Sequence, residues 1–116
     1  MTTISEMQRE SWEVSELKGW HVPQQRDDGL VRDASTGERL ALIHSEISEA
    51  LEEVRDKTPI VYEKDGKPEG VGIELADAVI RIGDLCEILG IDLEECIAIK
   101  TAFNRGREYR HGGRHL

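Results

Sequence analysis

Apolar residues recur at intervals of three and four along four stretches of the chain, which is the pattern of amphipathic helices. Residues typical of helix ends bound these stretches, with Gly19 and Gly90 closing two of them and Asp92 opening another. The expected helices run from about Ile4 to Lys18, from a Ser35 or Thr36 cap to about Lys57, from Glu69 to Leu89 and from Leu93 to Asn104. The pattern therefore predicts an all-α protein with a single domain over residues 1–116.

The connections between these helices differ in character. The stretch from His21 to Gly37 contains a proline, two glycines and a pair of aspartates, and we expect it to form a long loop. Residues 60–72 contain an Asp-Gly step between two short segments, and Asp-Gly favours the tight turn of a hairpin. We expect a small hairpin or flap there, between the second and third helices, and an irregular basic tail over residues 106–116.

The second predicted helix combines an apolar stripe with a row of acids. When it is wound at about 100° per residue, Glu46 and Glu53 fall at one edge of the stripe and Glu49 lies slightly further out. Glu46 and Glu49 can converge on one point, where two like charges repel unless a cation lies between them. A solvated acidic face is the alternative. The apolar stripe consists of Leu40, Ile43, Ile47, Ala50, Leu51 and Val54.

The third predicted helix carries a narrow polar stripe between apolar flanks. Its remaining surface is apolar nearly all round, with Leu75, Val79 and Ile82 on the far side, which is typical of a buried helix. Carboxylates on a buried helix are costly unless they are paired or bind a metal. Arg81 can neutralise one acid, with Asp84 a candidate, so a buried salt-bridge network is the alternative to a metal site. The stripe comprises Glu74, Asp77, Arg81 and Asp84.

Together the two helices present a pair of short acidic motifs. Glu46-x-x-Glu49 is followed, after 24 residues, by Glu74-x-x-Asp77. Four carboxylates without histidine select hard cations, Mg²⁺ or Mn²⁺, over zinc. The Glu-x-x-His repeats of di-iron bundles are missing. We therefore expect a magnesium site at these four residues.

Composition and charge bear on assembly and on partners. The chain has one Phe, two Tyr and two Trp, so aliphatic side chains must fill the core. A helical unit this short often completes its core with another copy, and we expect a homodimer or homotetramer. The net charge of −9 argues against general nucleic-acid binding, although residues 100–116 carry five Lys or Arg against one Glu.

Neither a targeting segment nor a membrane segment is apparent in the sequence. The first residues lack the basic-then-apolar order of a signal peptide, and no apolar run approaches about 18 residues. Cys86 and Cys96 lie ten apart, which fits neither a redox pair nor a zinc knuckle. We expect a cytoplasmic protein with no membrane partner.

The paired acidic motifs resemble those of the MazG-like all-α nucleoside triphosphate pyrophosphohydrolases. Glu46-Ile-Ser-Glu49 and Glu74-Leu-Ala-Asp77 correspond to the two halves of that signature. The resemblance covers about residues 36–111 and includes the helix-flap-helix arrangement and the run Lys100-x-x-x-Asn104-x-x-Arg107. Many members carry another glutamate where this chain has Ser45, so the number of bound metals stays open.

The resemblance implies magnesium-dependent hydrolysis of a nucleoside or deoxynucleoside triphosphate to the monophosphate and pyrophosphate. Among the acids, Glu49 is the first candidate to orient or deprotonate the attacking water, and Glu53, one turn further along, is the second. A phosphoribosyl-ATP pyrophosphohydrolase, on a similar helical scaffold, is an alternative. So is a non-catalytic helical interaction protein whose acids keep it soluble.

Substrate binding calls for cationic and aromatic groups. Lys100, Asn104 and Arg107 fall at i, i+4 and i+7 on one helix face and are expected to bind the departing pyrophosphate, with Arg110 extending the run. A basic helix end favoured by the helix dipole is the alternative. Trp20 can stack on the nucleobase, although packing against the protein is the default role of an indole.

Overall fold

The computed structural model describes residues 2–21, 24–25, 31–32 and 35–107 and is mostly helical, which confirms the all-α prediction at that level. The expected long loop of residues 21–37 contains a short ladder, and Arg110 lies outside the described residues. In chain order the elements are α1 (Ile4–Leu17), β1 (Gln24–Gln25), β2 (Val31–Arg32), α2 (Thr36–Arg55), β3 (Tyr62–Lys64), β4 (Lys67–Glu69), α3 (Val71–Leu89) and α4 (Leu93–Arg105).

The helices begin and end close to the positions that their capping residues indicate. The side chain of Ser35, rather than that of Thr36, caps α2 by accepting a hydrogen bond from the amide of Glu38. Asp92 caps α4 in the same way, and Gly90 ends α3 in the left-handed conformation with φ of 69°. These interactions are local in sequence, so the bounds follow from short stretches of the chain.

The expected hairpin forms between α2 and α3. β3 and β4 pair in antiparallel register, with Tyr62 opposite Glu69 and Lys64 opposite Lys67. Asp65 and Gly66 both have positive φ, of 52° and 79°, as a tight primed turn requires.

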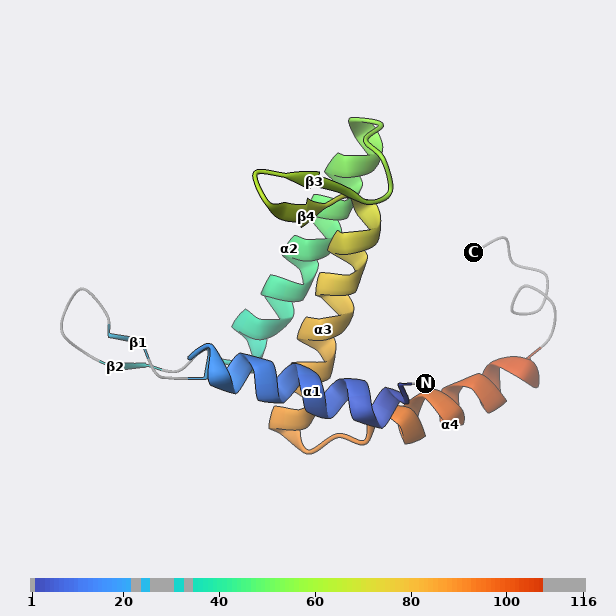
Figure 1. Ribbon diagram of the computed structural model, residues 1–116. Coiled ribbons are helices and arrows are strands. Elements are labelled where there is room, and N and C mark those ends of the chain that lie inside the picture. The colour runs from blue at the N-terminus through green and yellow to red at the C-terminus, as the bar shows by residue number, and fades with distance from the viewer. Residues whose placement is uncertain (1, 22–23, 26–30, 33–34, 108–116) are drawn as a thin grey trace.

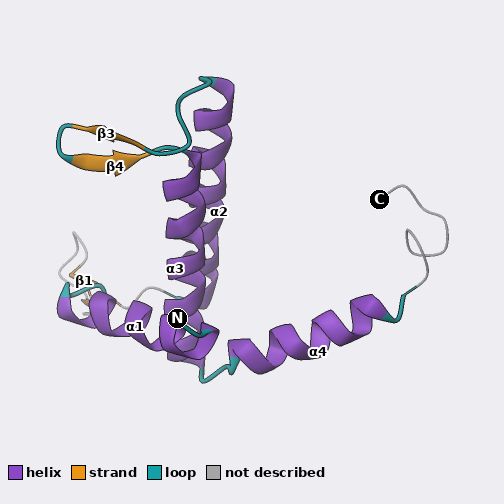
Figure 2. Ribbon diagram, turned by 45° about the vertical axis from the view of Figure 1, so that its right-hand side comes forward, coloured by secondary structure: helices purple, strands orange, loops and turns teal. Residues whose placement is uncertain are grey.

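The four helices do not close into a bundle within one chain. α2 and α3 lie side by side and antiparallel, α1 crosses the C-terminal part of α3, and α4 leads away from the other helices (Figures 1 and 2). The Cα radius of gyration is 17.5 Å, whereas a compact chain of this length has a radius of about 13 Å. The single chain is therefore an open arrangement of helices, and none of its described helices is long and apolar enough to cross a membrane.

Gln8 joins α1 to the turn between α3 and α4. Its amide nitrogen donates to Glu87 Oε2 at 2.8 Å and to the carbonyl of Ile91 at 2.7 Å. Its amide oxygen accepts a hydrogen bond from the backbone N–H of Leu93 at 3.2 Å. The side chain is 7% exposed, and its partly buried hydrogen bonds hold the turn from which α4 leaves the molecule.

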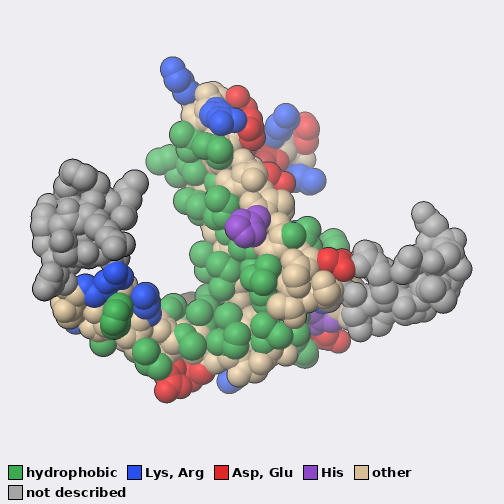
Figure 3. All heavy atoms as spheres, turned by 180° about the vertical axis from the view of Figure 1, so that it is seen from behind, with side chains coloured by type: hydrophobic (Ala, Val, Ile, Leu, Met, Phe, Trp, Pro, Cys, Tyr) green, Lys and Arg blue, Asp and Glu red, His purple; other side chains and the backbone are tan. Residues whose placement is uncertain are grey.

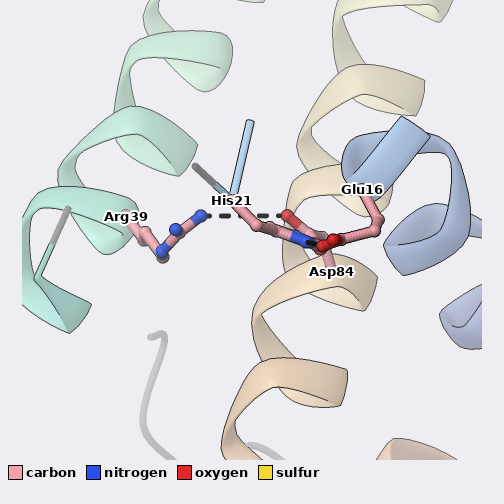
Figure 4. A network of polar contacts seen from close by, with 4 residues as sticks. All are labelled: Glu16, His21, Arg39 and Asp84. Carbon is pink, nitrogen blue, oxygen red and sulfur yellow. Dashed lines mark hydrogen bonds and ion pairs between the residues drawn. The ribbon is translucent and has the colours of Figure 1, made fainter. Parts of the chain in front are cut away.

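A polar network joins the end of α1 to α3 and to the start of α2 (Figure 4). The ring of His21 lies between two carboxylates, with Nδ1 2.6 Å from Glu16 Oε2 and Nε2 2.7 Å from Asp84 Oδ1. Arg39 lies 3.9 Å from the other oxygen of Asp84, and Trp12 packs against the histidine ring. Burial lowers the pKa of His21, but the hydrogen bonds to the two carboxylates and their charges outweigh it, so the pKa is raised.

The apolar core of the described chain is small, and the apolar faces of α2 and α3 lie largely outside it. Most of the apolar stripe of α2 is exposed, including Ile47 at 48% and Leu51 at 49%. The far side of α3, predicted to be buried, is also half exposed at Leu75 and Val79. The reason is that α2 turns its acidic edge toward α3, which leaves both apolar faces outside. Hydrophobic side chains accordingly gather along the back of the helix pair down to its base (Figure 3). Among the described residues, the buried apolar side chains are Ala50, Ala78, Leu85 and Cys86.

Candidate metal centre

The start of α3 is held directly beneath the hairpin by a close backbone contact. Gly70 has φ of 117°, and a Cβ atom there would lie 2.2 Å from the carbonyl oxygen of Ile60. The amide of Gly72 donates to the same oxygen at 3.0 Å. Because glycine tolerates this backbone conformation, Gly70 alone connects β4 to α3. The short connection keeps the hairpin close to the first acids of α3.

Three of the four predicted metal ligands come together between α2 and α3. Carboxylate oxygens of Glu46, Glu74 and Asp77 all lie within 4.8 Å of one another, and we call this group the helix cluster. Glu46 and Glu74 are each 7% exposed, and Asp77 is half-buried. Ala50 and Ala78, one turn after Glu46 and Glu74 on their helices, are also buried.

Glu49, the fourth predicted ligand, lies at the edge of the helix cluster. Its side chain is exposed, and its oxygens are not among those within 4.8 Å. It is nevertheless close enough to Glu74 to affect its protonation. Burial, the proximity of the Glu49 and Glu46 carboxyl groups, and the negative charges of Glu49 and Asp77 raise the pKa of Glu74 to about 7. Burial and the charge of Glu46 likewise raise the pKa of Asp77.

Positive charge compensates this cluster incompletely. Arg81 donates from Nε to Glu46 Oε1 at 2.9 Å, so its partner is Glu46 and not the candidate Asp84, which bonds to His21. Glu46 Oε2 and Glu74 Oε2 are buried without a hydrogen-bond partner among the described residues. A salt-bridge network therefore accounts for one oxygen of Glu46 and leaves two buried oxygens unsatisfied.

The donor set of the helix cluster fits a hard divalent cation. All its ligand atoms are carboxylate oxygens, which Mg²⁺ and Mn²⁺ prefer. Two oxygens bound to one Mg²⁺ at about 2.0–2.1 Å lie at most about 4.2 Å apart, so spacings within 4.8 Å need small side-chain adjustments. Such an ion would also offset the repulsion that raises the pKa of Glu74.

A second group of acids, which we call the hairpin cluster, shares Glu74 with the first. Oxygens of Glu53, Glu69 and Glu74 also lie within 4.8 Å of one another. Glu53 was expected near the site, but Glu69 was not predicted. A sequence signal for it exists, because the Asp-Gly turn fixes a register in which Glu69 lies opposite Tyr62.

Hydrogen bonds from the hairpin side of the site orient Glu53. The hydroxyl of Tyr62 donates to both of its carboxylate oxygens at 3.1 Å, and the hydroxyl of Thr58 donates to Oε2. Burial, followed by the hydrogen bond and charge of Glu53, raises the pKa of Tyr62, so the phenol stays protonated as a donor.

The predicted substrate-binding residues lie away from the carboxylates of their own chain. Lys100 and Arg107 are exposed on or just after α4, and both lie over the ring of Phe103, at 4.8 and 5.4 Å. Asn104 is exposed on α4. This helix starts beyond Leu89, the last residue of α3, which lies about 22 Å from Glu74 along the axis of α3. Trp20, 66% exposed, follows α1 at the same end of α3.

Comparison of the chain with protein-family models, with curated proteins and with solved structures finds no match.

Proposed function

We propose that this chain is a magnesium-dependent nucleoside triphosphate pyrophosphohydrolase of the MazG-like type. The observation that carries the proposal is the helix cluster, in which Glu46, Glu74 and Asp77 converge between two helices. Two of its oxygens are buried and lack a partner among the described residues, which is costly without a bound cation. The acidic motifs that resemble the family signature supply these residues.

The residues around the cluster suit hydrolysis of a phosphoric anhydride. Glu46, Glu74 and Asp77 would hold the magnesium, which would supply an activated water and positive charge for the phosphate oxygens. Glu49, exposed beside Glu74, is the better placed acid to accept a proton from the attacking water. Glu53 is less suited to this role, since Tyr62 and Thr58 already donate to its oxygens.

The proposed enzyme works as a homo-oligomer. The helix pair of α2 and α3 exposes apolar side chains on both helices, and a copy of the same pair would cover them, giving a four-helix bundle. α4 has no buried residue within the described chain and needs similar cover. In such an assembly Lys100, Asn104 and Arg107 bind the pyrophosphate group at the carboxylates of another copy.

Hydrolysis in ¹⁸O-labelled water tests the reaction. We expect each triphosphate that is turned over to give a labelled nucleoside monophosphate and unlabelled pyrophosphate, with no turnover when magnesium is chelated. Release of orthophosphate and a nucleoside diphosphate would contradict the assignment. Turnover of phosphoribosyl-ATP alone would favour the alternative enzyme.

A matched pair of variants ties the reaction to the cluster. Asp77→Asn removes one charge from the helix cluster and should lower kcat/KM at least about 100-fold, which corresponds to about 2.7 kcal/mol of transition-state stabilisation. Asp56→Asn makes the same change at the exposed end of α2 and should leave activity unchanged. Equal activity of the two variants would exclude the cluster as the active site.

A further inference from the structure

Arg81 lies next to the helix cluster with most of its hydrogen-bonding capacity unused. It follows Asp77 by one turn of α3 and donates from Nε to Glu46 Oε1 at 2.9 Å. A guanidinium group also carries N–H donors on its two terminal nitrogens, and these have no hydrogen-bond partner among the described residues. The side chain of Arg81 is 44% exposed, so it reaches solvent although the carboxylate that holds it is buried.

The ion pair with Glu46 fixes the guanidinium group beside the cluster. Arg81 uses only Oε1 of Glu46, so the unpartnered Oε2 is left for the cation proposed there. Burial and the charge of Glu46 raise the pKa of Asp77, and the positive charge of Arg81 partly offsets them. Arg81 therefore acts on two residues of the cluster, and it keeps its charge because a guanidinium group does not lose its proton in proteins.

The free donors of Arg81 suit a phosphate group. Among the described residues, Arg81 is the only Lys or Arg that forms an ion pair with the helix cluster. Arg39 lies 3.9 Å from Asp84 instead, and Lys100 and Arg107 lie away from the cluster of their own chain. A planar guanidinium group binds phosphate oxygens through two parallel hydrogen bonds, and its charge offsets that of a polyanion. The cation closest to the carboxylates is thus also one with paired donors to spare.

We propose that Arg81 binds a phosphate group of the triphosphate directly, in the same chain that supplies the carboxylates. The inference rests on the proposed function, because it needs a triphosphate at the helix cluster. Glu46 holds the guanidinium group through Nε, and the terminal nitrogens donate to phosphate oxygens. Phosphate recognition then does not depend only on donors from α4 of another copy.

Binding measurements separate this role from a structural one. The probe is a nucleoside triphosphate with a methylene group in place of the α–β bridging oxygen, titrated calorimetrically into the full chain loaded with Mn²⁺. Arg81→Lys keeps a positive charge beside Glu46 but lacks the paired donors, so it should bind Mn²⁺ as the wild-type protein does and the analogue about 10–100-fold more weakly. Arg55→Lys is the matched control, because Arg55 pairs with Glu52 at the exposed end of α2, and it should bind both ligands like the wild-type protein.

A second variant, Arg81→Gln, removes the charge and keeps a donor for Glu46. It should bind Mn²⁺ more tightly than the wild-type protein, because a like charge is lost beside the ion, and it should bind the analogue at least as weakly as Arg81→Lys does. If both Arg81 variants bind the analogue like the wild-type protein, or if weaker Mn²⁺ binding accounts for the whole loss, this inference is overturned while the proposed function stands. If the wild-type protein binds no Mn²⁺, or binds no such analogue of any common nucleoside triphosphate once loaded, the proposed function fails, and this inference fails with it.

Discussion

The protonation of Glu74 should affect both metal binding and the free energy of unfolding, because this residue belongs to both carboxylate clusters. Its pKa of about 7 in the folded chain lies above its ordinary value of 4.5. Between these two values the folded protein holds a proton that the unfolded chain has released. The contribution of Glu74 to the free energy of unfolding therefore falls as pH rises through this window. Magnesium should compete with the same proton, so its affinity should rise over the same range.

This linkage predicts a pH-dependent difference between two proteins. In the absence of metal, the free energy of unfolding of the wild-type chain should fall relative to that of Glu74→Gln as pH rises from about 4.5 to about 7, because glutamine does not titrate. Urea denaturation across this range measures the difference. A difference that stays constant with pH would show that Glu74 is not perturbed in the folded state.

At the scale of elements, the docking of α1 on α3 depends on a titratable contact. The raised pKa of His21 means that its stabilising charge is fully present below its ordinary pKa of about 6.5 and is lost as pH rises through the folded value. The groups that face it are Glu16 on α1, Asp84 on α3 and, beyond Asp84, Arg39 on α2.

We expect His21→Gln to cost about 1–3 kcal/mol at pH 6, because it removes a charge-assisted hydrogen bond to a buried carboxylate. The cost should shrink as pH is raised toward 9, because the wild-type histidine loses its proton in that direction. Hydrogen exchange of α1 amides, measured for both proteins at the two pH values, checks this. Equal protection of α1 in both proteins at pH 6 would contradict it.

The junction of the hairpin and α3 depends on one glycine. Gly70→Ala should destabilise the fold by more than about 1 kcal/mol, since φ is 117° and the new Cβ would overlap the carbonyl oxygen of Ile60. Gly37→Ala, in the first turn of α2, is the control. There the nearest atom would lie 3.8 Å away, and we expect a gain of about 0.5–1 kcal/mol from helix propensity. Thermal unfolding of both variants would compare them, and equal midpoints would refute the strain argument.

At the scale of the whole molecule, the exposed apolar faces predict association. A chain of this length with so few buried apolar side chains gains too little from its own core, and a second copy would supply the missing contacts. Leu51→Lys should therefore shift the sedimentation of the protein to a 13.1 kDa monomer, while Glu52→Lys, on the neighbouring polar side of α2, should not. A monomeric wild-type protein at micromolar concentration would contradict this prediction.

Association also predicts that the site draws on two copies. Asp77→Asn lacks a cluster carboxylate, and Lys100→Ala lacks a donor on α4. If α4 of one chain binds substrate at the cluster of another, mixing these two impaired variants should restore part of the activity, because some pairs then combine an intact cluster with an intact α4. Activity that stays at the level of the separate variants would show that α4 does not reach the cluster of another copy.

Short stretches of sequence were sufficient to predict the helices, the hairpin and three of the clustered acids. Caps such as Ser35 and Asp92, the Asp-Gly turn and the three-residue spacing within each acidic motif act over a few residues, so their consequences can be predicted locally. These features led to three carboxylates that do converge in the structure. The structure also bears out the hairpin between α2 and α3.

Other features depended on contacts between distant segments. The apolar stripe and the acidic edge of α2 compete to face α3, and which one turns inward depends on the partner helix and on the buried acids of α3. The pairing of Arg81 with Glu46 links residues 35 apart, and the direction of α4 depends on the buried side chain of Gln8, more than 80 residues from the turn that it holds. Rotation of a helix about its axis and the choice of an ion-pair partner are set by interactions shared among elements, so no single stretch of the chain contains that information.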